Sequence, residues 1–421
     1  MTTMRVLWVT YAALGRAAKI IEGASSQSGT WIDATAAALF ENKNIQLGVA
    51  AIASRDVKIE DAETGITFYG LNTVRRIWGQ RPHASDGAYW QAVIEDFAPD
   101  CIMVWGTEFA NGLSVLDAAG KVPVLFFIQG VLGRIVDYPM GLLQSSELFR
   151  YTGPIGLLKA LHFKKDHAAQ KRQTAFEAEM VRRSAGILTD NDWADSYYRL
   201  VAPQVQIYRC PLPINRVFLE DTYTQKERTP YTLFTIDGCN PAKGIFHLIK
   251  ALAIVKERYP DTKLHIPGAI SSRKPTIIFE SPYFTYLKKL VKKLGLEENI
   301  EFCGRLSSEQ MKEKIDSCAA FVMPSCVENH SASLREAMYA GAPCISAMVG
   351  SVDEYTQYGH DVLTYRYGED DVLATHILHL FEDSEYARKL GKNAWYSIRA
   401  NYPLDDLCAV VSDIYQDVIN K

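Results

Sequence analysis

The sequence predicts an α/β protein with two domains, each built around a parallel sheet with helices on both faces. Its 421 residues exceed what a single hydrophobic core usually supports. Apolar runs typical of buried strands alternate with amphipathic stretches typical of helices, which is the pattern of parallel α/β sheets. A charged, turn-rich run at residues 220–230 separates the two halves. With 48% hydrophobic residues, the chain can fill both cores.

The first half contains five apolar runs that we expect to be buried strands, at residues 5–9, 45–53, 101–105, 122–128 and 183–189. After the first of them, the polar loop from Gly23 to Gly29 leads into a predicted helix with apolar residues at Ile32 and Leu39. A Gly/Ser-rich turn that faces a helix N-terminus is typical of anion sites. Gly29 is therefore a candidate binding residue.

Two of these strands end in polar side chains. The third run is followed by Gly106-Thr107-Glu108, and the fourth by Gln129-Gly130. Open α/β sheets bind ligands beyond the carboxyl ends of their strands, so Glu108 and Gln129 are candidate site residues. Gln129 can donate and accept hydrogen bonds but cannot titrate. The alternative for Glu108 is a solvated acid at a strand end.

The second half carries most of its chemistry in residues 321–343. The apolar run 321–323 predicts a strand that Pro324 ends, and Ser331 and Ser333 are N-cap candidates for a short helix that stops at Gly341. A strand, a polar turn and a helix N-terminus together form a cradle for an anion, because the first backbone N–H groups of a helix have no internal partner.

Two glutamates flank this cradle. Glu328 falls in the predicted loop and Glu336, with seven residues between them, falls in the predicted helix. Their carboxylates can accept hydrogen bonds from sugar hydroxyls on either side of a phosphate, a combination that suits a nucleotide sugar. As alternatives, Glu336 can form a capping box with Ser333, and Glu328 can be a solvated loop acid. The candidate contacts between them are Asn329, His330, Ser331 and Ala332.

The order of motifs in this half resembles a known family. Pro-Ser-x-x-Glu ends at Glu328, Glu-Ala-Met begins at Glu336, and Gly-x-Pro-Cys-Ile and Gly-Ser-Val-Asp-Glu follow at residues 341–345 and 350–354. This sequence of elements resembles the donor-site signature of the retaining glycosyltransferases of family 4, also called group 1, which have the GT-B fold. The resemblance spans most of residues 180–400. It implies two Rossmann-like domains whose parallel sheets face an interdomain cleft.

Further positions acquire roles from the resemblance. Lys243-Gly244 opens a predicted helix as the phosphate-binding Lys of the family does, and Gly304-Arg305 lies in the turn that precedes the helix at the nucleotide base. The implied activity is a metal-independent, retaining hexosyl transfer from a nucleotide-diphosphate sugar. In it Glu328 holds the hydroxyls of the donor sugar, Glu336 holds the ribose, and Lys243 neutralises the leaving diphosphate.

The chain departs from the family pattern at two positions. Gln129 stands where the family usually has a His beside the donor sugar, which leaves Glu108 as the candidate for handling a proton or binding the acceptor. Gly238 stands five residues before Lys243, where the family commonly has an Arg. Candidates for a replacement cation are Arg305, Arg273 and Lys274. Some polysaccharide-assembling members carry Trp-Gly-Thr-Glu and Ile-Gln-Gly motifs like those that end at Glu108 and Gly130.

The predicted boundaries follow from the resemblance together with the turn-rich run. Residues 1–219 are expected to form the acceptor-binding domain and residues 220–402 the donor-binding domain, with residues 403–421 forming a helix that crosses back to the first domain. The acceptor is expected to be a saccharide or a lipid-linked saccharide in polysaccharide or glycoconjugate biosynthesis.

Composition limits the partners and the location. A net charge of −4 and a pI near 6.2 argue against nucleic acid, since a basic surface is its usual electrostatic footprint. The eight cysteines show no metal-site spacing, so neither a metal nor a cofactor besides the nucleotide-sugar co-substrate is expected. We expect the apolar start of the chain to be a strand and not a signal peptide, and we expect no membrane span. The expected location is the cytoplasm.

Residues 133–172 have no place in the predicted core pattern. Apolar side chains and clustered cations alternate there, which favours contact with an anionic lipid surface at the inner face of the membrane or with a lipid diphosphate acceptor. The alternative is a solvated excursion of the first domain.

Two other functions fit part of the sequence. A GT-B sugar-nucleotide epimerase needs no acceptor site, so the segment 133–172 argues against it. A catalytically silent nucleotide-sugar-binding protein would explain Gly238 and Gln129, which depart from the family pattern. It would not explain why the family residues Glu328, Glu336 and Lys243 are present.

Overall fold

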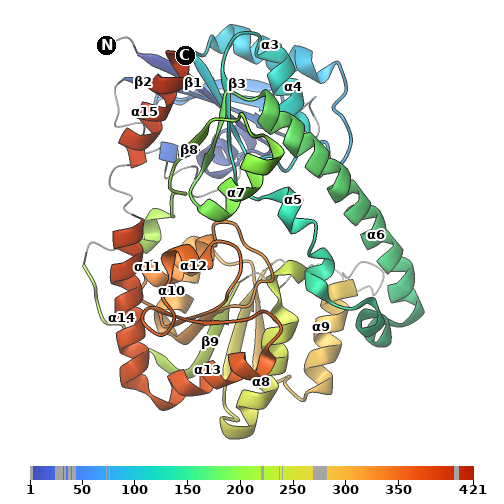
Figure 1. Ribbon diagram of the computed structural model, residues 1–421, viewed down its shortest axis with the longest axis vertical. Helices are drawn as coiled ribbons and strands as arrows, with labels where there is room; N and C mark the ends of the chain where they lie inside the picture. The colour runs from blue at the N-terminus through green and yellow to red at the C-terminus, as the bar shows by residue number, and fades with distance from the viewer. Residues whose placement is uncertain are drawn as a thin grey trace. The chain divides into compact units, whose positions relative to one another are not determined.

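The structure is a computed structural model of the chain. It describes residues 3–23, 32, 35–36, 39, 44–72, 74, 76–219, 222–236, 238, 240–268, 282–402 and 407–421, apart from the side chains of residues 145, 149, 152–164 and 166. The chain divides into two compact units. Unit 1 comprises residues 1–136, 167–215 and 403–421, and unit 2 comprises residues 137–166 and 216–402. Figure 1 shows the elements coloured along the chain.

Unit 1 is built on an eight-stranded sheet with the order β3-β4-β2-β1-β5-β6-β7-β8. Every neighbouring pair is parallel except β3 and β4 at one edge. The central strands are almost completely buried, as expected for parallel strands covered on both faces. The strands are β1 Met4–Thr10, β2 Ile45–Ile52, β3 Val57–Glu60, β4 Thr67–Leu71, β5 Cys101–Trp105, β6 Val124–Phe127, β7 Gly186–Thr189 and β8 Ile207–Arg209.

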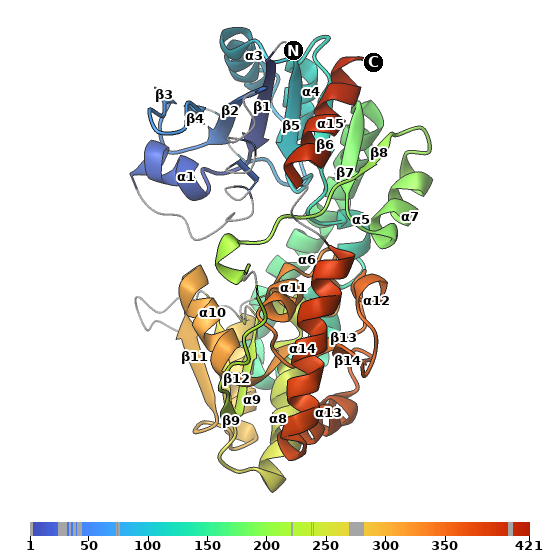
Figure 2. The same cartoon turned by 90° about the vertical axis from the view of Figure 1, so that its left-hand side faces the viewer.

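Helices cover both faces of this sheet. Helix α15 comes last in the chain, yet it packs against unit 1, where Tyr415 accepts a hydrogen bond from Trp8 at 2.8 Å; Figure 2 shows it in red beside the strands. The helices are α1 Gly15–Ala17 with the π-helix η1 Ala18–Glu22, α3 Asp86–Phe97, α4 Asn111–Ala118, α5 Leu132–Ile135, α7 Asp192–Val201, α15 Leu407–Ile419 and the C-terminal part of α6 Ser145–Arg183.

Unit 2 is built on a six-stranded parallel sheet with the order β11-β10-β9-β12-β13-β14. Its strands are β9 Thr229–Thr235, β10 Lys263–Pro267, β11 Ile300–Gly304, β12 Cys318–Met323, β13 Cys344–Ala347 and β14 Val362–Tyr365. Its helices are α8 Ile245–Arg258, α9 Pro282–Lys293, α10 Ser308–Ser317, α11 Ala332–Tyr339, α12 Val352–Tyr355, α13 Asp370–Glu382 and α14 Ser384–Asn401, with 3-10 turns η2 Pro139–Leu142, η3 Arg216–Phe218 and η4 Pro241–Lys243.

The predicted α/β class with two parallel sheets is confirmed, and each strand expected in the first half is present within a few residues of its predicted bounds. The short strands β3 and β4 were not predicted. None of the helices in the described part of the chain has the length and apolar character that a bilayer crossing requires.

Residues 137–149 pack on unit 2, whereas the sequence placed them with the first domain. Leu143 and Leu148 are buried in the core of unit 2, and Tyr286 donates a hydrogen bond to Glu147 at 2.7 Å. Gly141 has φ +62°, and a Cβ there would lie 2.1 Å from the carbonyl oxygen of Pro241, so only glycine permits this approach. Leu143 and Leu148 are consequently not available to a lipid surface.

Candidate functional site

The topology of unit 2 places its polar loops at one point of the sheet. From β9 the chain continues outward to β10 and β11, and from β12 it continues in the opposite direction to β13 and β14. The carboxyl ends of β9 and β12 therefore border the switch point, where doubly wound sheets leave a crevice for ligands. The loop after β9 carries Lys243, and the loop after β12 carries Glu328.

Lys243 and Glu328 form an ion pair at this switch point. The Nζ of Lys243 lies 2.6 Å from Oε1 of Glu328, and the Ser325 hydroxyl donates to the same oxygen at 2.5 Å. The two side chains are 29% and 13% exposed, so the pair is largely removed from water but still reachable. A cation that is held beside a helix start by one carboxylate can exchange part of that contact for a phosphate.

Backbone contacts join the two loops. The amide of Cys326 donates to the carbonyl oxygen of Ala242 at 2.9 Å. Gly244 has φ +64°, and a Cβ on it would lie 1.9 Å from the carbonyl oxygen of Pro324. A side chain at position 244 would push the loops apart, which explains a glycine directly after Lys243.

A third loop supports Glu328 from β13. Gly350 has φ +60°, and a Cβ there would lie 1.6 Å from the carbonyl oxygen of Glu328, so any side chain would displace this backbone. The Ser351 hydroxyl donates to the carbonyl oxygen of Asn329 at 2.5 Å. The Gly350-Ser351 pair thus fixes the peptide that carries the Glu328 carboxylate.

The short helix predicted after Glu328 is α11, and Ser331 occupies its N-cap. Its backbone is left-handed, at φ 46° and ψ 52°, and its hydroxyl faces the sulfur of Met323 instead of capping the helix. The expected side-chain cap is therefore absent. The first N–H groups of α11, from Ala332 onward, consequently have no capping side chain, and this is the arrangement that favours an anion.

Glu336 is half-buried in α11, and no described residue forms a hydrogen bond or an ion pair with its carboxylate. Burial raises its pKa to about 7, partly offset by the charge of Arg335. The capping-box alternative for Glu336 is wrong, because the helix begins at Ala332 and Ser333 lies inside it. A helix-capping role therefore does not explain the glutamate at this position.

The remaining predicted residues of unit 2 have varied positions. Asn329, His330 and Ser331 are buried in the loop after β12, whereas Ala332 is half-buried. Gly304 ends β11 with φ +72°, and Arg305 beside it is exposed. Gly29, Arg273 and Lys274 lie outside the described residues.

Gly238 shows why an arginine is missing at its position. A Cβ there would lie 2.6 Å from the Cγ2 of Ile266, a contact that a larger side chain cannot make without moving the neighbouring strand. Its amide donates to the carbonyl oxygen of Pro267 at 2.9 Å. The loop after β9 therefore packs on β10 at the place where the family pattern has a cation.

Unit 1 brings Glu108 close to Gly130, the residue after Gln129. The carboxylate of Glu108 accepts hydrogen bonds from the backbone N–H groups of Glu108 itself, Gly130 and Thr107. Burial, and then the negative charge of Glu177, raise its pKa to about 7 against those hydrogen bonds. Glu108 is thus not the solvated acid of the alternative interpretation. A carboxyl group with a pKa near 7 can take up or release a proton at neutral pH.

Glu177 was not among the site residues predicted from the sequence. It lies in α6 and is completely buried, and its carboxylate accepts hydrogen bonds from the Thr107 hydroxyl at 3.0 Å and the Tyr198 hydroxyl at 2.7 Å. The amides of Leu132 and Gly133 donate to it at 3.2 and 3.1 Å. One side chain therefore joins the loops after β5 and β6 to α6 and α7.

A sequence signal for Glu177 did exist. Gln173, Glu177 and Met180 follow each other at helical spacing, and all three are completely buried. An acid in the apolar stripe of a helix requires buried partners, because an uncompensated charge there is expensive. Burial raises the pKa of Glu177 to about 7, against the hydrogen bonds that it accepts.

The raised pKa values of Glu108 and Glu177 predict a pH-dependent stability of unit 1. A carboxyl group with a folded pKa of about 7 and an unfolded pKa near 4.5 stabilises the fold fully below pH 4.5, and this contribution is lost as the pH rises through 7. We therefore expect the free energy of unfolding to fall between pH 5 and pH 8. Urea unfolding at intervals of one pH unit measures this slope.

The variant Glu108→Gln should have a shallower slope, because it removes one of the two titrating groups. Glu179→Gln is the matched control, since Glu179 pairs with Arg81 at the protein surface and should leave the slope unchanged. An unfolding free energy of the wild-type protein that rises over this pH range would contradict the assignment.

Comparisons with known proteins bear on both units. Residues 221–395 match the model of the family described as glycosyl transferases group 1. The N-acetyl-alpha-D-glucosaminyl L-malate synthase of Bacillus anthracis is 27% identical over 146 residues, which are 35% of this chain and 38% of that protein. The chain thus matches well under two thirds of this relative's length.

Solved structures match over the full chain. The sucrose-phosphate synthase of Thermosynechococcus elongatus has a TM-score of 0.72 at 15% identity and covers 99% of both chains. The Anabaena protein HepE, solved in complex with UDP and glucose, has a TM-score of 0.65 at 15% identity and covers 98% of this chain and 100% of its own. At these identities the likeness concerns the fold, and the matched structures are GT-B glycosyltransferases.

Proposed function

We propose that the chain is a retaining hexosyltransferase of group 1, because residues 221–395 match the model of that family and the fold is GT-B. It moves a sugar from a UDP- or GDP-sugar to a saccharide or lipid-linked acceptor in polysaccharide or glycoconjugate biosynthesis. The observation that carries the proposal is the Lys243–Glu328 pair at the switch point of unit 2.

The donor diphosphate lies between Lys243 and the start of α11. Lys243 supplies a full positive charge, and the uncapped N–H groups from Ala332 onward supply the positive end of the helix dipole. Both act on the phosphate oxygen where negative charge develops as the sugar leaves, so they stabilise the transition state more than the ground state. No divalent metal is required in this scheme.

Glu328 and Glu336 hold hydroxyl groups of the donor. Glu328 accepts hydrogen bonds from the sugar, while its ion pair keeps Lys243 aimed at the phosphate. Glu336, whose carboxylate has no hydrogen-bond partner among the described residues, accepts hydrogen bonds from the ribose hydroxyls. Gly304 and Arg305 border the base, and Asn329, His330 and Ser331 shape the turn between sugar and phosphate.

The transfer takes place on one face of the sugar. The acceptor hydroxyl oxygen bonds to the anomeric carbon, the bond from that carbon to the phosphate oxygen breaks, and the acceptor proton passes to the departing phosphate. The configuration at the anomeric carbon is then retained. In unit 1, Glu108 and Gln129 bind the acceptor, and Glu108 can also relay its proton because its pKa lies near 7.

The HepE structure, which was solved in complex with UDP and glucose, supports a UDP-sugar as the donor. A panel of UDP-, GDP- and ADP-sugars tests the proposal. A transferase slowly hydrolyses its own donor and releases the nucleoside diphosphate, and the released sugar keeps the anomeric configuration of the donor when its NMR spectrum is recorded before mutarotation.

The same panel separates the alternatives. An epimerase converts the sugar of its substrate and leaves the nucleotide sugar intact, whereas a silent binding protein only shows saturable binding. Either result would replace the transferase proposal. The compact packing at Gly238 favours the silent protein, since it removes a cation. The Lys243–Glu328 pair favours a catalytic role, as does Glu336, whose carboxylate has no partner among the described residues.

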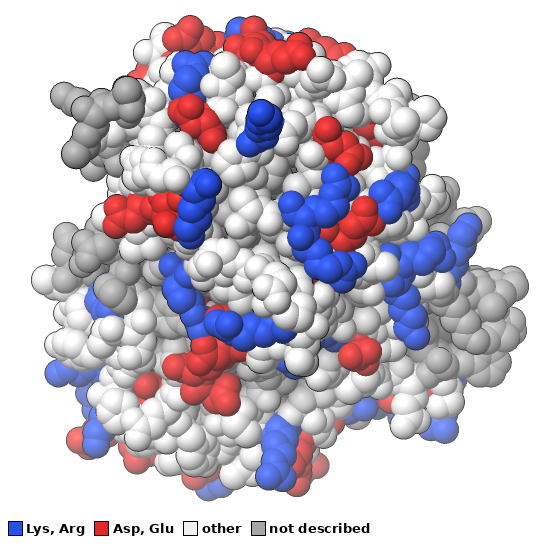
Figure 3. Space-filling model, turned by 45° about the horizontal axis from the view of Figure 1, so that its top comes forward, with Lys and Arg blue, Asp and Glu red and all other residues white. Residues whose placement is uncertain are grey.

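We further propose a cytoplasmic location with peripheral contact to an anionic membrane. The support is the cationic part of α6, in which Arg150, Lys165, Lys171 and Arg172 are exposed, with Leu142 exposed before it. Lys and Arg side chains lie interspersed with Asp and Glu on the face drawn in Figure 3, so a local cluster and not a uniformly basic surface must provide the attraction.

The membrane proposal predicts salt-sensitive sedimentation with anionic liposomes. Each basic side chain near an anionic leaflet contributes about 1 kcal/mol, so the double variant Lys165→Gln/Lys171→Gln should bind roughly 30-fold more weakly at low salt. The control is Lys289→Gln/Lys292→Gln, two exposed lysines of α9. Equal binding of all three proteins, or no binding of the wild type, would favour a soluble acceptor.

A further inference from the structure

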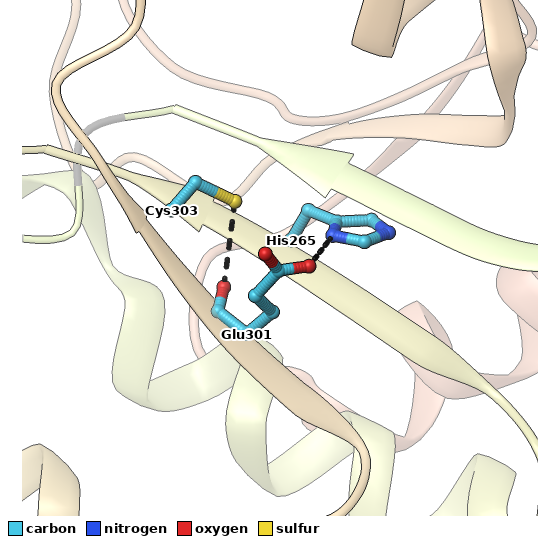
Figure 4. Close-up of side chains that lie close together, drawn as sticks. All are labelled: His265, Glu301 and Cys303. Carbon is cyan, nitrogen blue, oxygen red and sulfur yellow. Dashed lines mark hydrogen bonds and ion pairs between the residues drawn. The ribbon is translucent and has the colours of Figure 1, made fainter.

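A cluster of three potential metal ligands lies at the edge of the sheet of unit 2. It consists of His265 on β10 and of Glu301 and Cys303 on β11, and one ligand atom from each lies within 4.8 Å of the others. Strand β11 is the outermost strand of the sheet. Figure 4 shows the three side chains, with His265 turned toward the carboxylate of Glu301.

Strand register brings these residues together. His265 is paired directly with Glu301 across the parallel ladder. Cys303 follows Glu301 by two residues, at the point where the register between β10 and β11 shifts, and its Sγ still lies within 4.8 Å of the ligand atoms of His265 and Glu301. All three ligand types are therefore held by two hydrogen-bonded strands.

We propose that His265, Glu301 and Cys303 bind one zinc ion. Imidazole nitrogen, thiolate sulfur and carboxylate oxygen are the ligands that zinc takes in proteins, at about 2.0 to 2.3 Å. A tetrahedral ion of that size needs its ligand atoms roughly 3.5 Å apart, which side-chain rotation reaches from the separations present here. The fourth position is left to water.

The charges of the cluster suit a divalent ion. Glu301 and a Cys303 thiolate together supply two negative charges, which neutralise the zinc. His265 and Glu301 pair with each other at 2.7 Å, and the thiol of Cys303 donates to the carbonyl oxygen of Glu301 at 3.7 Å. The ion would take the place of the direct contact between His265 and Glu301.

One nearby cation opposes the ion. The ammonium group of Lys314 in α10 acts electrostatically on both His265 and Cys303. Its removal should strengthen zinc binding, and this response distinguishes an ion at the cluster from an ion bound elsewhere.

The zinc site is separate from the proposed transfer chemistry. Strand β10 is two positions away from β12, the strand that leads to Glu328, and neither Lys243 nor Glu328 belongs to the cluster. Cys303 directly precedes Gly304 and Arg305, so the ion would fix the end of β11. Zinc binding can be measured on the full chain without any nucleotide sugar, so failure of this proposal and failure of the proposed function are distinguishable.

The test is a titration of the tag-free, chelator-treated protein with Zn²⁺ against a chromophoric chelator, and with Co²⁺ by absorption. We expect one equivalent of each ion to bind and cobalt to show a thiolate charge-transfer band. Cys303→Ser should abolish that band and weaken zinc binding by at least about 100-fold, because even outer-shell partners contribute about 10- to 100-fold. Cys408→Ser, another half-buried cysteine, is the control.

Two further variants keep the proposal open to failure if Cys303→Ser does not fold. Glu301→Gln, at an exposed side chain, should weaken zinc binding, and Lys314→Met should strengthen it. Absence of a bound equivalent in the wild-type protein, or zinc affinities equal in all variants, would overturn the site.

Discussion

Replacing Lys243 by alanine should lower kcat/KM for the donor by about 10- to 150-fold. The change removes a charge-assisted contact to the diphosphate that contributes about 1.5 to 3 kcal/mol. It also leaves the Glu328 carboxylate, 13% exposed, with the Ser325 hydroxyl and without its cation. Both effects weaken the stabilisation of the leaving group. We therefore expect the fold-change in kcat to exceed the fold-change in affinity for the free nucleoside diphosphate.

Steady-state rates with the preferred donor of the nucleotide-sugar panel measure this loss. Lys289→Ala is the matched control, since Lys289 is exposed on α9 and should retain the wild-type rate. Lys243→Arg keeps the charge and should retain more activity than Lys243→Ala. Full activity of Lys243→Ala in a protein with unchanged thermal stability would remove Lys243 from the proposed mechanism.

The sheets could be predicted because parallel strands covered on both faces are continuous apolar runs. The residues of β5, CIMVW, and of β6, VLFF, are buried throughout. Strand β3 was missed because it is a four-residue edge strand with alternating exposure, and such a short pattern is not distinguishable from a loop. The assignment of residues 137–149 to unit 2 depends on where Leu143 and Leu148 find their partners, which local pattern does not contain.

The contact between Lys243 and Glu328 was accessible to sequence reasoning. Both follow strands, and the carboxyl ends of parallel strands meet at one edge of the sheet, so their loops had to lie near each other. The backbone of Ser331 was not accessible, because a left-handed serine is uncommon and the rule for N-caps expects an extended residue. The same holds for Gly238, since the obstacle is the side chain of Ile266 on another strand.

The helical spacing of Gln173, Glu177 and Met180 could indicate a buried Glu177, but its four hydrogen-bond donors could not be predicted, because they come from three other segments of unit 1. This arrangement predicts that Glu177→Ala lowers the free energy of unfolding by about 3 to 5 kcal/mol. The substitution leaves buried hydroxyl and amide donors without an acceptor, and each such group costs about 1 to 3 kcal/mol, with water entry and relaxation limiting the sum.

Urea unfolding, followed by hydrogen exchange of the β5 and β6 amides, measures the loss and assigns it to unit 1. Glu179→Ala is the control two residues away. Its partner Arg81 is 58% exposed, and surface pairs of this kind contribute about 0 to 1 kcal/mol. The stability of Glu177→Gln should lie between those of Glu177→Ala and Glu179→Ala. Its side-chain oxygen can still accept a hydrogen bond from Tyr198 or Thr107, whereas its NH2 group would face other donors. If Glu177→Ala is no less stable than Glu179→Ala, then the carboxylate is not what holds the loops after β5 and β6 together, and the acceptor site proposed for Glu108 and Gln129 loses its support.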